Sequence, residues 1–227
     1  MSEKTVLDRE DVRRTLVRIA HEIVEKTGGQ RVAVVGIHRR GAVLAARLRD
    51  RVAELLGEPV PLGDVDISFY RDDLDRRDPT AQPVVHASHV DFPVEDTTVV
   101  LVDDVLYTGR TVRAAIDALF DYGRPERVQL AVLADRGHRE LPIRPDYVGK
   151  NLPTARGERV NVRVEEIDGV DEVAIAERVE DPARTSTCCP STTSRARTSS
   201  ASSGAPRASP RSRGARSRRC RLCAGAR

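Results

Sequence analysis

Apolar side chains recur every three to four positions in three stretches of the first 180 residues, which is the spacing of an amphipathic helix. The predicted helices span residues 8–27, 41–56 and 111–122. A glycine follows each of them, at Gly28, Gly57 and Gly123, where a helix can end in the left-handed conformation. These stretches therefore have both the period and the stop signals of helices.

Shorter apolar or alternating runs lie between these helices and predict strands. They span residues 31–37, 65–70, 97–102 and 128–134. Two further predicted strands, residues 160–164 and 172–176, flank Asp168 and Gly169, a dipeptide typical of hairpin turns. This order predicts an α/β fold with a central, mainly parallel sheet flanked by helices. We expect residues 128–167 to add a small hood.

Ligands bind at the carboxyl ends of the strands in such sheets, so the loops after residues 37, 70, 102 and 134 should meet at one edge. Residues 71–89 are charged, contain Pro79 and Pro83, and are expected to form a long loop. Loops of this length in a compact domain are usually functional lids or disordered.

The composition changes abruptly near residue 180. Residues 181–227 contain no Val, Ile, Phe or Tyr, and their 11 arginines and one acid give a formal charge of +10. Residues 1–180 contain 27 basic and 34 acidic side chains, a formal charge of −7. So little apolar surface cannot offset an ordering entropy of about 1–2 kcal/mol per residue. We expect a folded domain over residues 1–180 and a disordered Arg/Ser/Ala-rich tail over residues 181–227. The tail is interpreted either as the product of a shifted reading frame in GC-rich DNA or as an RNA-binding extension.

All four cysteines lie in that tail, so residues 1–180 contain neither a disulfide nor a thiolate metal site. No apolar run approaches the roughly 18 residues of a membrane span. The charged N-terminus lacks the apolar core of a secretion signal. We therefore expect a cytoplasmic protein that does not enter a membrane. His138 has no second His or Cys at ligand spacing, and we expect no metal site made by side chains alone.

Residues 99–111, VVLVDDVLYTGRT, carry the strongest indication of chemistry. A predicted strand brings Asp103 and Asp104 to its tip, and a short loop leads from them into a helix. Helix N-termini expose unpaired backbone N–H groups that bind phosphate readily. Gly109 permits a tight turn there, and Thr108 and Thr111 add hydroxyl donors. Paired carboxylates beside a phosphate cradle suit a phosphorylated sugar whose own oxygens coordinate Mg²⁺.

The same stretch resembles the phosphoribosyl pyrophosphate (PRPP) signature of type I phosphoribosyltransferases. Four further segments extend the resemblance to the PyrR family, whose members bind RNA as pyrimidine-operon regulators and are also uracil phosphoribosyltransferases. These segments are residues 70–74 (YRDDL), 123–125 (GRP), 135–144 (DRGHRELPIR) and 149–154 (GKNLPT). The resemblance covers roughly residues 5–178 and implies the type I phosphoribosyltransferase fold.

The resemblance implies an enzyme that converts uracil and PRPP to UMP and pyrophosphate, with Mg²⁺ delivered by PRPP. Asp103, Asp104 and Arg40 form the implied catalytic set: the two acids hold the ribose, and Arg40 with Gly41 holds the pyrophosphate. Arg136 and Val160 lie at the uracil end, and residues 70–89 close over the reacting centre. The implied 5′-phosphate loop consists of Val105, Leu106, Tyr107, Thr108, Gly109, Arg110 and Thr111.

The resemblance also implies a homodimer or higher homo-oligomer that binds the mRNA leader of pyrimidine genes in response to UMP. Its candidate RNA contacts are His21 on the first helix, and Arg139 and Arg144 after strand 128–134. The family has Thr where this chain has Val17, and also where it has Arg39 before the pyrophosphate loop. Two alternatives stay open: a salvage enzyme without RNA regulation, and an RNA regulator with vestigial catalysis.

Deleting residues 181–227 should leave both the melting temperature and the phosphoribosyltransferase activity nearly unchanged, because the segment has almost no apolar side chain to bury. Its positive charge should add only non-specific RNA affinity, which collapses between low and physiological salt. Thermal melts, activity assays and RNA titrations of the two proteins check this. A melting temperature many degrees lower, or a loss of UMP-responsive RNA binding, would make the tail a structural element.

Overall fold

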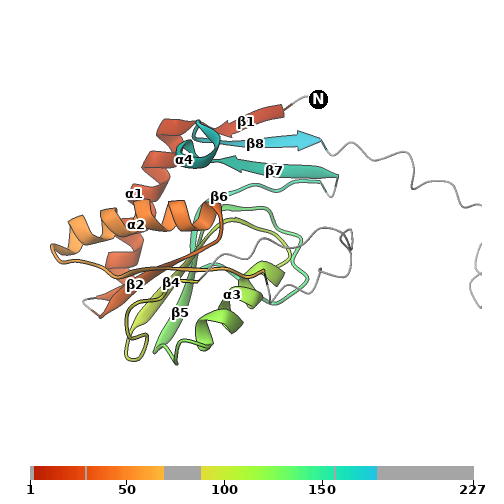
Figure 1. The fold of residues 1–227 in the computed structure, drawn as a ribbon. Helices are drawn as coiled ribbons and strands as arrows, with labels where there is room; N and C mark the ends of the chain where they lie inside the picture. Colours follow the sequence, from red (N-terminus) through yellow and green to blue (C-terminus); the bar gives the residue numbers. More distant parts are fainter. Residues whose placement is uncertain (1–2, 29, 69–87, 156, 178–227) are drawn as a thin grey trace, which may run out of the picture. The chain divides into compact units, whose positions relative to one another are not determined.

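A computed structural model describes residues 3–28, 30–68, 88–155 and 157–177 (Figure 1). The tail expected over residues 181–227 and nearly all of the expected lid lie outside the described residues. Of the helices in the described ranges, none has both the length and the apolar character needed to cross a membrane.

Five parallel strands form the central sheet in the order β3-β2-β4-β5-β6. Their bounds are β2 (Val32–Ile37), β3 (Leu62–Val65), β4 (Thr98–Leu106), β5 (Arg127–Asp135) and β6 (Tyr147–Asn151). Alternate side chains of β4 enter different cores: Val100 packs with α1 and α2, and Leu101 with α3. The central strands β2, β4 and β5 are therefore buried on both faces, as their continuous apolar runs predicted.

All three predicted helices are present, and their ends lie within two residues of the predicted ones. They are α1 (Arg9–Thr27), α2 (Arg40–Leu56) and α3 (Arg110–Phe120). Helix α1 begins at a capping box, in which the Asp11 N–H donates to Asp8 Oδ1 at 2.8 Å. It ends at Gly28, whose φ of 55° is left-handed.

A second, antiparallel sheet lies across the core formed by α1 and α2 (Figure 1). It consists of β1 (Glu3–Leu7), β8 (Glu172–Glu177) and β7 (Glu158–Arg163), in that order. The short helix α4 (Glu165–Asp168) lies between β7 and β8. Val162 and Val173 of this sheet belong to the same buried cluster as α1 and α2, so one core joins the two sheets.

The expected source of the hood, residues 128–167, is right only in part. Most of β5 and all of β6 fall in this range but belong to the central sheet, whereas β7 belongs to the small second sheet. The other two strands of that second sheet, β1 and β8, lie outside the expected range. The antiparallel pairing of β7 and β8 is confirmed. The predicted tight turn at Asp168 and Gly169 is wrong: Asp168 is the last residue of α4, and Gly169 is its left-handed cap with φ 75°.

The strand predicted over residues 65–70 is wrong for residues 66–68, because β3 ends at Val65, and residues 69 and 70 lie outside the described residues. The side chain of Asp66 accepts hydrogen bonds from the N–H and the hydroxyl of Ser68, at 2.8 and 2.6 Å. Such a local turn offers the backbone an alternative to the sheet ladder, which ends the strand.

The chain reverses its direction of travel across the sheet between β2 and β4. Strand β2 leads through α2 to β3 on one side, and β4 leads through α3 to β5 on the other. Helices α2 and α3 pack into different cores on opposite faces of the sheet. In open parallel sheets ligands bind at this switch point, beyond the carboxyl ends of the two diverging strands.

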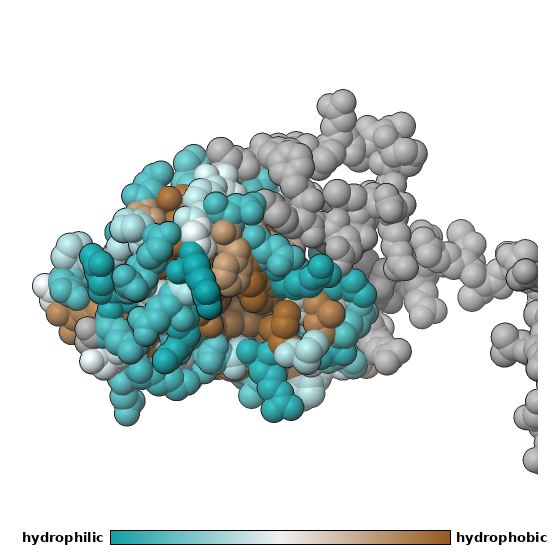
Figure 2. Space-filling view, turned by 90° about the horizontal axis from the view of Figure 1, so that it is seen from below, coloured by the Kyte–Doolittle hydropathy of each residue, from teal (hydrophilic) through white to brown (hydrophobic). Residues whose placement is uncertain are grey.

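Among the described helices, α3 covers the face of the sheet opposite α1 and α2, and apolar side chains gather at the surface of that face (Figure 2). Several apolar residues that pack against the core on the α3 side are only partly buried. They are Phe92, Ile116, Val128, Ile143 and Val148.

Two glycines let the first turn of α2 approach the sheet closely. A Cβ on Gly36 would lie 2.4 Å from the Cα of Ala42, and a Cβ on Gly41 would lie 2.6 Å from the carbonyl oxygen of Val102. Real Cβ atoms essentially never come so near to other atoms. The first turn of α2 therefore packs directly onto the backbones of β2 and β4.

Gly36→Ala should lower the free energy of unfolding by roughly 1–3 kcal/mol or more, because the atoms that its Cβ would meet belong to the backbone and cannot rotate away. Denaturant unfolding measures the loss. Gly157→Ala is the matched control, since its Cβ would meet nothing within 4 Å and should cost within about 0.5 kcal/mol. Equal stability of the two variants would contradict the close contact.

Candidate active site

Two adjacent carboxylates lie on β4 where its neighbour β2 turns away. Strand β2 pairs with β4 only as far as Val102, whereas β5 continues beside β4 to Leu106. Asp103 and Asp104 follow directly after Val102. The sequence predicted them at the tip of the strand, but they lie within it, because β4 continues to Leu106. The two acids therefore lie at the switch point of the sheet.

The surroundings of Asp103 disfavour its negative charge. The residue is only 6% exposed. Burial, and then the charge of Asp104 beside it, raise the pKa of the Asp103 carboxyl well above its usual value. Its Oδ1 accepts the N–H of Asp104 at 2.9 Å, and Asp104 Oδ1 accepts the N–H of Val105 at 2.7 Å. The pair is oriented by the backbone and suits a ligand that brings hydroxyl donors or positive charge.

The loop after β4 forms a cradle at the N-terminus of α3. Gly109 precedes the helix with a φ of 93°, a left-handed conformation that favours glycine. The carbonyl oxygen of Thr108 accepts the N–H groups of Glu140 and Leu141 at 3.0 and 3.1 Å. The Thr108 hydroxyl accepts the N–H of Arg110 at 3.3 Å. The remaining first-turn N–H groups and the positive end of the helix dipole suit a phosphate.

Arg139 holds this loop in place through hydrogen bonds to its backbone. Its Nη1 donates to the carbonyl oxygens of Leu106, Tyr107 and Gly137 at 3.3, 2.9 and 3.2 Å. Its Nη2 contacts Asp135 Oδ2 at 2.6 Å. Arg139 was a candidate RNA contact, and these hydrogen bonds favour a role in shaping the phosphate loop instead. The other two candidates, His21 on α1 and Arg144 between β5 and β6, are exposed.

Arg136 links three parts of the site. Its Nε donates to the Thr154 hydroxyl at 3.0 Å and its Nη2 to the Glu158 carbonyl at 2.5 Å. Its guanidinium carbon lies 4.1 Å from the centroid of the Tyr107 ring, a cation–π contact. The phosphate loop, the end of β5 and the start of β7 are thereby held together. Val160, the other residue predicted for the uracil end, is buried in β7.

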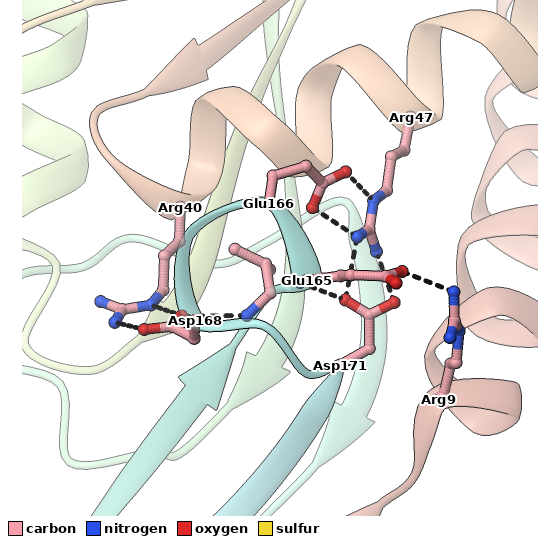
Figure 3. A network of polar contacts seen from close by, with 8 residues as sticks. Arg9, Arg40, Arg47, Glu165, Glu166, Asp168 and Asp171 are labelled. Carbon is pink, nitrogen blue, oxygen red and sulfur yellow. Dashed lines mark hydrogen bonds and ion pairs between the residues drawn. The ribbon is translucent and has the colours of Figure 1, made fainter.

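The predicted pyrophosphate loop lies at the start of α2. Gly41 touches β4 at Val102 and Asp103, as described above. Arg40 donates through Nε and Nη2 to the two carboxylate oxygens of Asp168, at 3.0 and 2.8 Å (Figure 3). This contact raises the pKa of Arg40, so its positive charge is secure. Arg39 is exposed beside it, and the peptide bond between His38 and Arg39 is cis.

Sequence reasoning missed the partners that hold these two arginines. Asp168 lies 128 residues from Arg40, and Thr154 lies 18 residues from Arg136. No local period or spacing connects such pairs, since the fold alone brings them together. Asp168 was noticed only as a turn former.

Within the described residues, no group of three or more His, Cys, Asp or Glu side chains could hold a metal ion. The two carboxylates of Asp103 and Asp104 nevertheless fit Mg²⁺ brought by a phosphorylated substrate. Mg²⁺ keeps several waters and usually takes one or two protein carboxylates together with substrate oxygens.

Comparison with known proteins agrees with this geometry. Residues 2–166 match the model of the phosphoribosyl transferase domain family. The chain is 60% identical over 177 residues to a protein of Roseiflexus sp. named "Bifunctional protein PyrR", which covers 77% of this chain and 96% of that protein. A protein of the same name from Deinococcus radiodurans is 56% identical, over 75% of this chain and 93% of its own.

Solved structures share the fold at low sequence identity. The hypoxanthine phosphoribosyltransferase of Trypanosoma cruzi superposes with a TM-score of 0.59 at 19% identity, covering 78% of this chain and 97% of that one.

Asp103→Asn should stabilise the fold at pH 7. A carboxyl whose folded pKa is raised contributes stability below its ordinary pKa, near 3.8, and loses that contribution as the pH rises through the folded value. The amide keeps an oxygen for the Asp104 N–H and carries no charge. We expect a higher melting temperature for the variant at pH 7, by about 2–4 °C for each kcal/mol gained.

The difference in melting temperature between Asp103→Asn and wild type should become smaller as the pH falls toward 4. Glu25→Gln, at an exposed position of α1, is the control and should show no such difference. A variant that is less stable than wild type at pH 7 would contradict the unfavourable burial of the Asp103 charge.

Proposed function

We propose a function for this chain, which belongs to the PyrR family of phosphoribosyl transferase domain proteins. It transfers the phosphoribosyl group of PRPP to uracil. It also regulates pyrimidine genes by binding their mRNA in response to UMP. One observation carries the catalytic part. The paired acids Asp103 and Asp104 and the α3 N-terminal cradle lie together at the switch point of the sheet.

We assign the sugar and its 5′-phosphate to this edge of β4. Asp103 and Asp104 accept hydrogen bonds from the ribose hydroxyls, and both carboxylates are oriented by backbone N–H groups. The 5′-phosphate takes the loop of Val105, Leu106, Tyr107, Thr108, Gly109, Arg110 and Thr111, at the positive end of α3. Carboxylates at one end and a helix N-terminus at the other fix the direction of the substrate.

Transfer of the ribose builds positive charge at its C1 and negative charge on the departing pyrophosphate. Asp103 and Asp104 favour the first charge, and the guanidinium of Arg40 favours the second from the start of α2. Gly41 lets the backbone of this loop reach the leaving group. Mg²⁺ bound by the pyrophosphate neutralises part of the remaining negative charge. Positioning and fixed charges of this kind supply most of the catalysis, so no covalent nucleophile is required.

We assign uracil to the side of Arg136, Tyr107 and Val160. Arg136 is held by Thr154 and the Glu158 carbonyl, which makes it a rigid neighbour for a planar base. Val160 adds a buried apolar contact from β7.

RNA binding falls to the surface of the same domain. His21 and Arg144 are exposed and accessible to a strand of RNA. Arg139, in contrast, donates to the carbonyl oxygens of Leu106 and Tyr107 in the phosphate loop and contacts Asp135. The partly buried apolar side chains on the α3 face offer a surface for a second copy, consistent with a homo-oligomer. A cytoplasmic location fits a protein that meets both PRPP and mRNA.

A salvage enzyme without RNA regulation is the second candidate. The engagement of Arg139 and the presence of Val17 favour it. The deciding experiment runs uracil phosphoribosyl transfer beside RNA binding, with and without UMP, on the full chain. Transfer without UMP-responsive RNA binding identifies the salvage enzyme; RNA binding without transfer identifies a regulator with vestigial catalysis.

Asp103→Asn combined with Asp104→Asn should reduce turnover of uracil and PRPP at least about a hundredfold, because both positioning groups for the ribose are removed. The fold should survive, as a thermal melt will show, and the control Glu25→Gln should have the turnover of wild type. Turnover at the wild-type level in the double variant would move the site elsewhere.

Uracil should have a higher kcat/KM than orotate, hypoxanthine or guanine in assays of the wild-type protein.

A further inference from the structure

The only contacts between Arg40 and another described side chain in Figure 3 are those with Asp168. The guanidinium meets the carboxylate side-on, Nε to Oδ2 and Nη2 to Oδ1. The Arg40 side chain is 36% exposed and that of Asp168 19%, so the pair is shielded from much of the solvent. Paired, nearly parallel hydrogen bonds of this kind fix the plane of the guanidinium as well as its position.

Asp168 is itself fixed. Its Oδ2 also accepts the N–H of Val164 at 3.0 Å, which ties the carboxylate to the start of its own short helix. That helix is anchored to α2 a second time, through Arg47. Arg47 donates to Glu166 at 2.9 and 2.5 Å and to Asp171 at 3.1 and 2.9 Å.

A further bond completes this support, since Asp171 Oδ1 accepts the N–H of Glu165 at 2.8 Å. Arg9 of α1 contacts Glu165 as well (Figure 3). Asp168 therefore approaches Arg40 from a turn that is tied to both α1 and α2.

The side-on contact uses Nε and one hydrogen of Nη2, two of the five N–H donors of an arginine. The Nη1 edge of Arg40 makes no hydrogen bond to any residue in the described ranges. Asp104 acts on the Arg40 charge electrostatically, so the guanidinium is near the paired acids. The Nη1 edge can donate to a phosphate oxygen while Asp168 keeps its own contact.

We propose that Asp168 is a positioning residue: it holds Arg40 in the orientation that receives the pyrophosphate of PRPP, and it thereby favours PRPP over UMP, which has no pyrophosphate. The inference rests on the function proposed for Arg40. An arginine without this support would have to be ordered by the ligand, at a cost of about three- to tenfold in affinity for one long side chain.

A carboxylate this close to the loop could instead compete with pyrophosphate for Arg40. The geometry favours positioning, because Asp168 occupies one edge of the guanidinium, is held there by Val164, and leaves the opposite edge open. Competition and positioning predict opposite signs for removal of the charge, which makes them separable by experiment.

Asp168→Asn is the test variant, since its amide oxygen can still accept the Val164 N–H. Calorimetry in the presence of Mg²⁺ gives the Kd values for PRPP, for pyrophosphate and for UMP. We expect PRPP and pyrophosphate to bind about three- to tenfold more weakly and UMP to change by less than about twofold. The KM for PRPP should rise more than kcat falls, and Asp168→Glu should restore part of the affinity.

Glu166→Gln is the matched control, because it removes an acid from the same turn that pairs with Arg47 rather than with Arg40. It should leave all three Kd values within about twofold. Unchanged or tighter PRPP binding by Asp168→Asn would overturn the positioning role, and so would an equal loss for UMP.

Arg40→Ala separates this inference from the proposed function. If Arg40→Ala weakens PRPP and Asp168→Asn does not, only the role of Asp168 is wrong. If Arg40→Ala leaves PRPP binding unchanged, the assignment of Arg40 to the pyrophosphate fails, and the inference about Asp168 fails with it.

Discussion

The close backbone contact between the first turn of α2 and β4 determines where a site can form in this fold. The absence of a Cβ on Gly36 lets the first turn of α2 pack on β2, and its absence on Gly41 lets the same turn lie against Val102 and Asp103 of β4. The distance between the proposed pyrophosphate loop and the paired acids is thus set by main-chain packing. Side chains that project from this region can differ without moving the backbone, and Arg39 is such an exposed side chain.

The acidic pair of the site is electrostatically unfavourable, whereas the nearby arginines form favourable ion pairs. Asp103 is buried beside another acid, an arrangement that is unfavourable for the protein alone and gains from a ligand. Arg40, Arg47 and Arg139 are each bound to carboxylates that the fold brings to them. The cations are therefore oriented while one acid is held at a cost. Stored electrostatic cost of this kind is typical of functional sites rather than of structural ion pairs.

The sequence was most informative where structure depends on neighbours along the chain. The three helices were predicted because their period and terminal glycines are local signals, and the stretch from Asp103 to Thr111 is a contiguous motif. Strand β1 was missed because Glu3 to Leu7 gains its structure by pairing with β8, and Glu3 lies opposite Ala176. Strand β6 is short, contains Gly149, and depends on β5 in the same way. The partners of Arg40 and Arg136 were missed for the same reason: contact at large sequence separation leaves no pattern to count.

The pairing of β1 with β8 has a consequence for how the protein is made. Among the described strands, β1 pairs with β8, so β1 cannot join the sheet until residues 172–177 have left the ribosome. The parallel sheet, whose last strand ends at Asn151, can assemble earlier. Contacts of such high sequence separation form late because a long loop must first close. Asp168 is synthesised in that last portion, so a nascent chain contains the acids of β4 and the arginine of α2 well before it can orient that arginine.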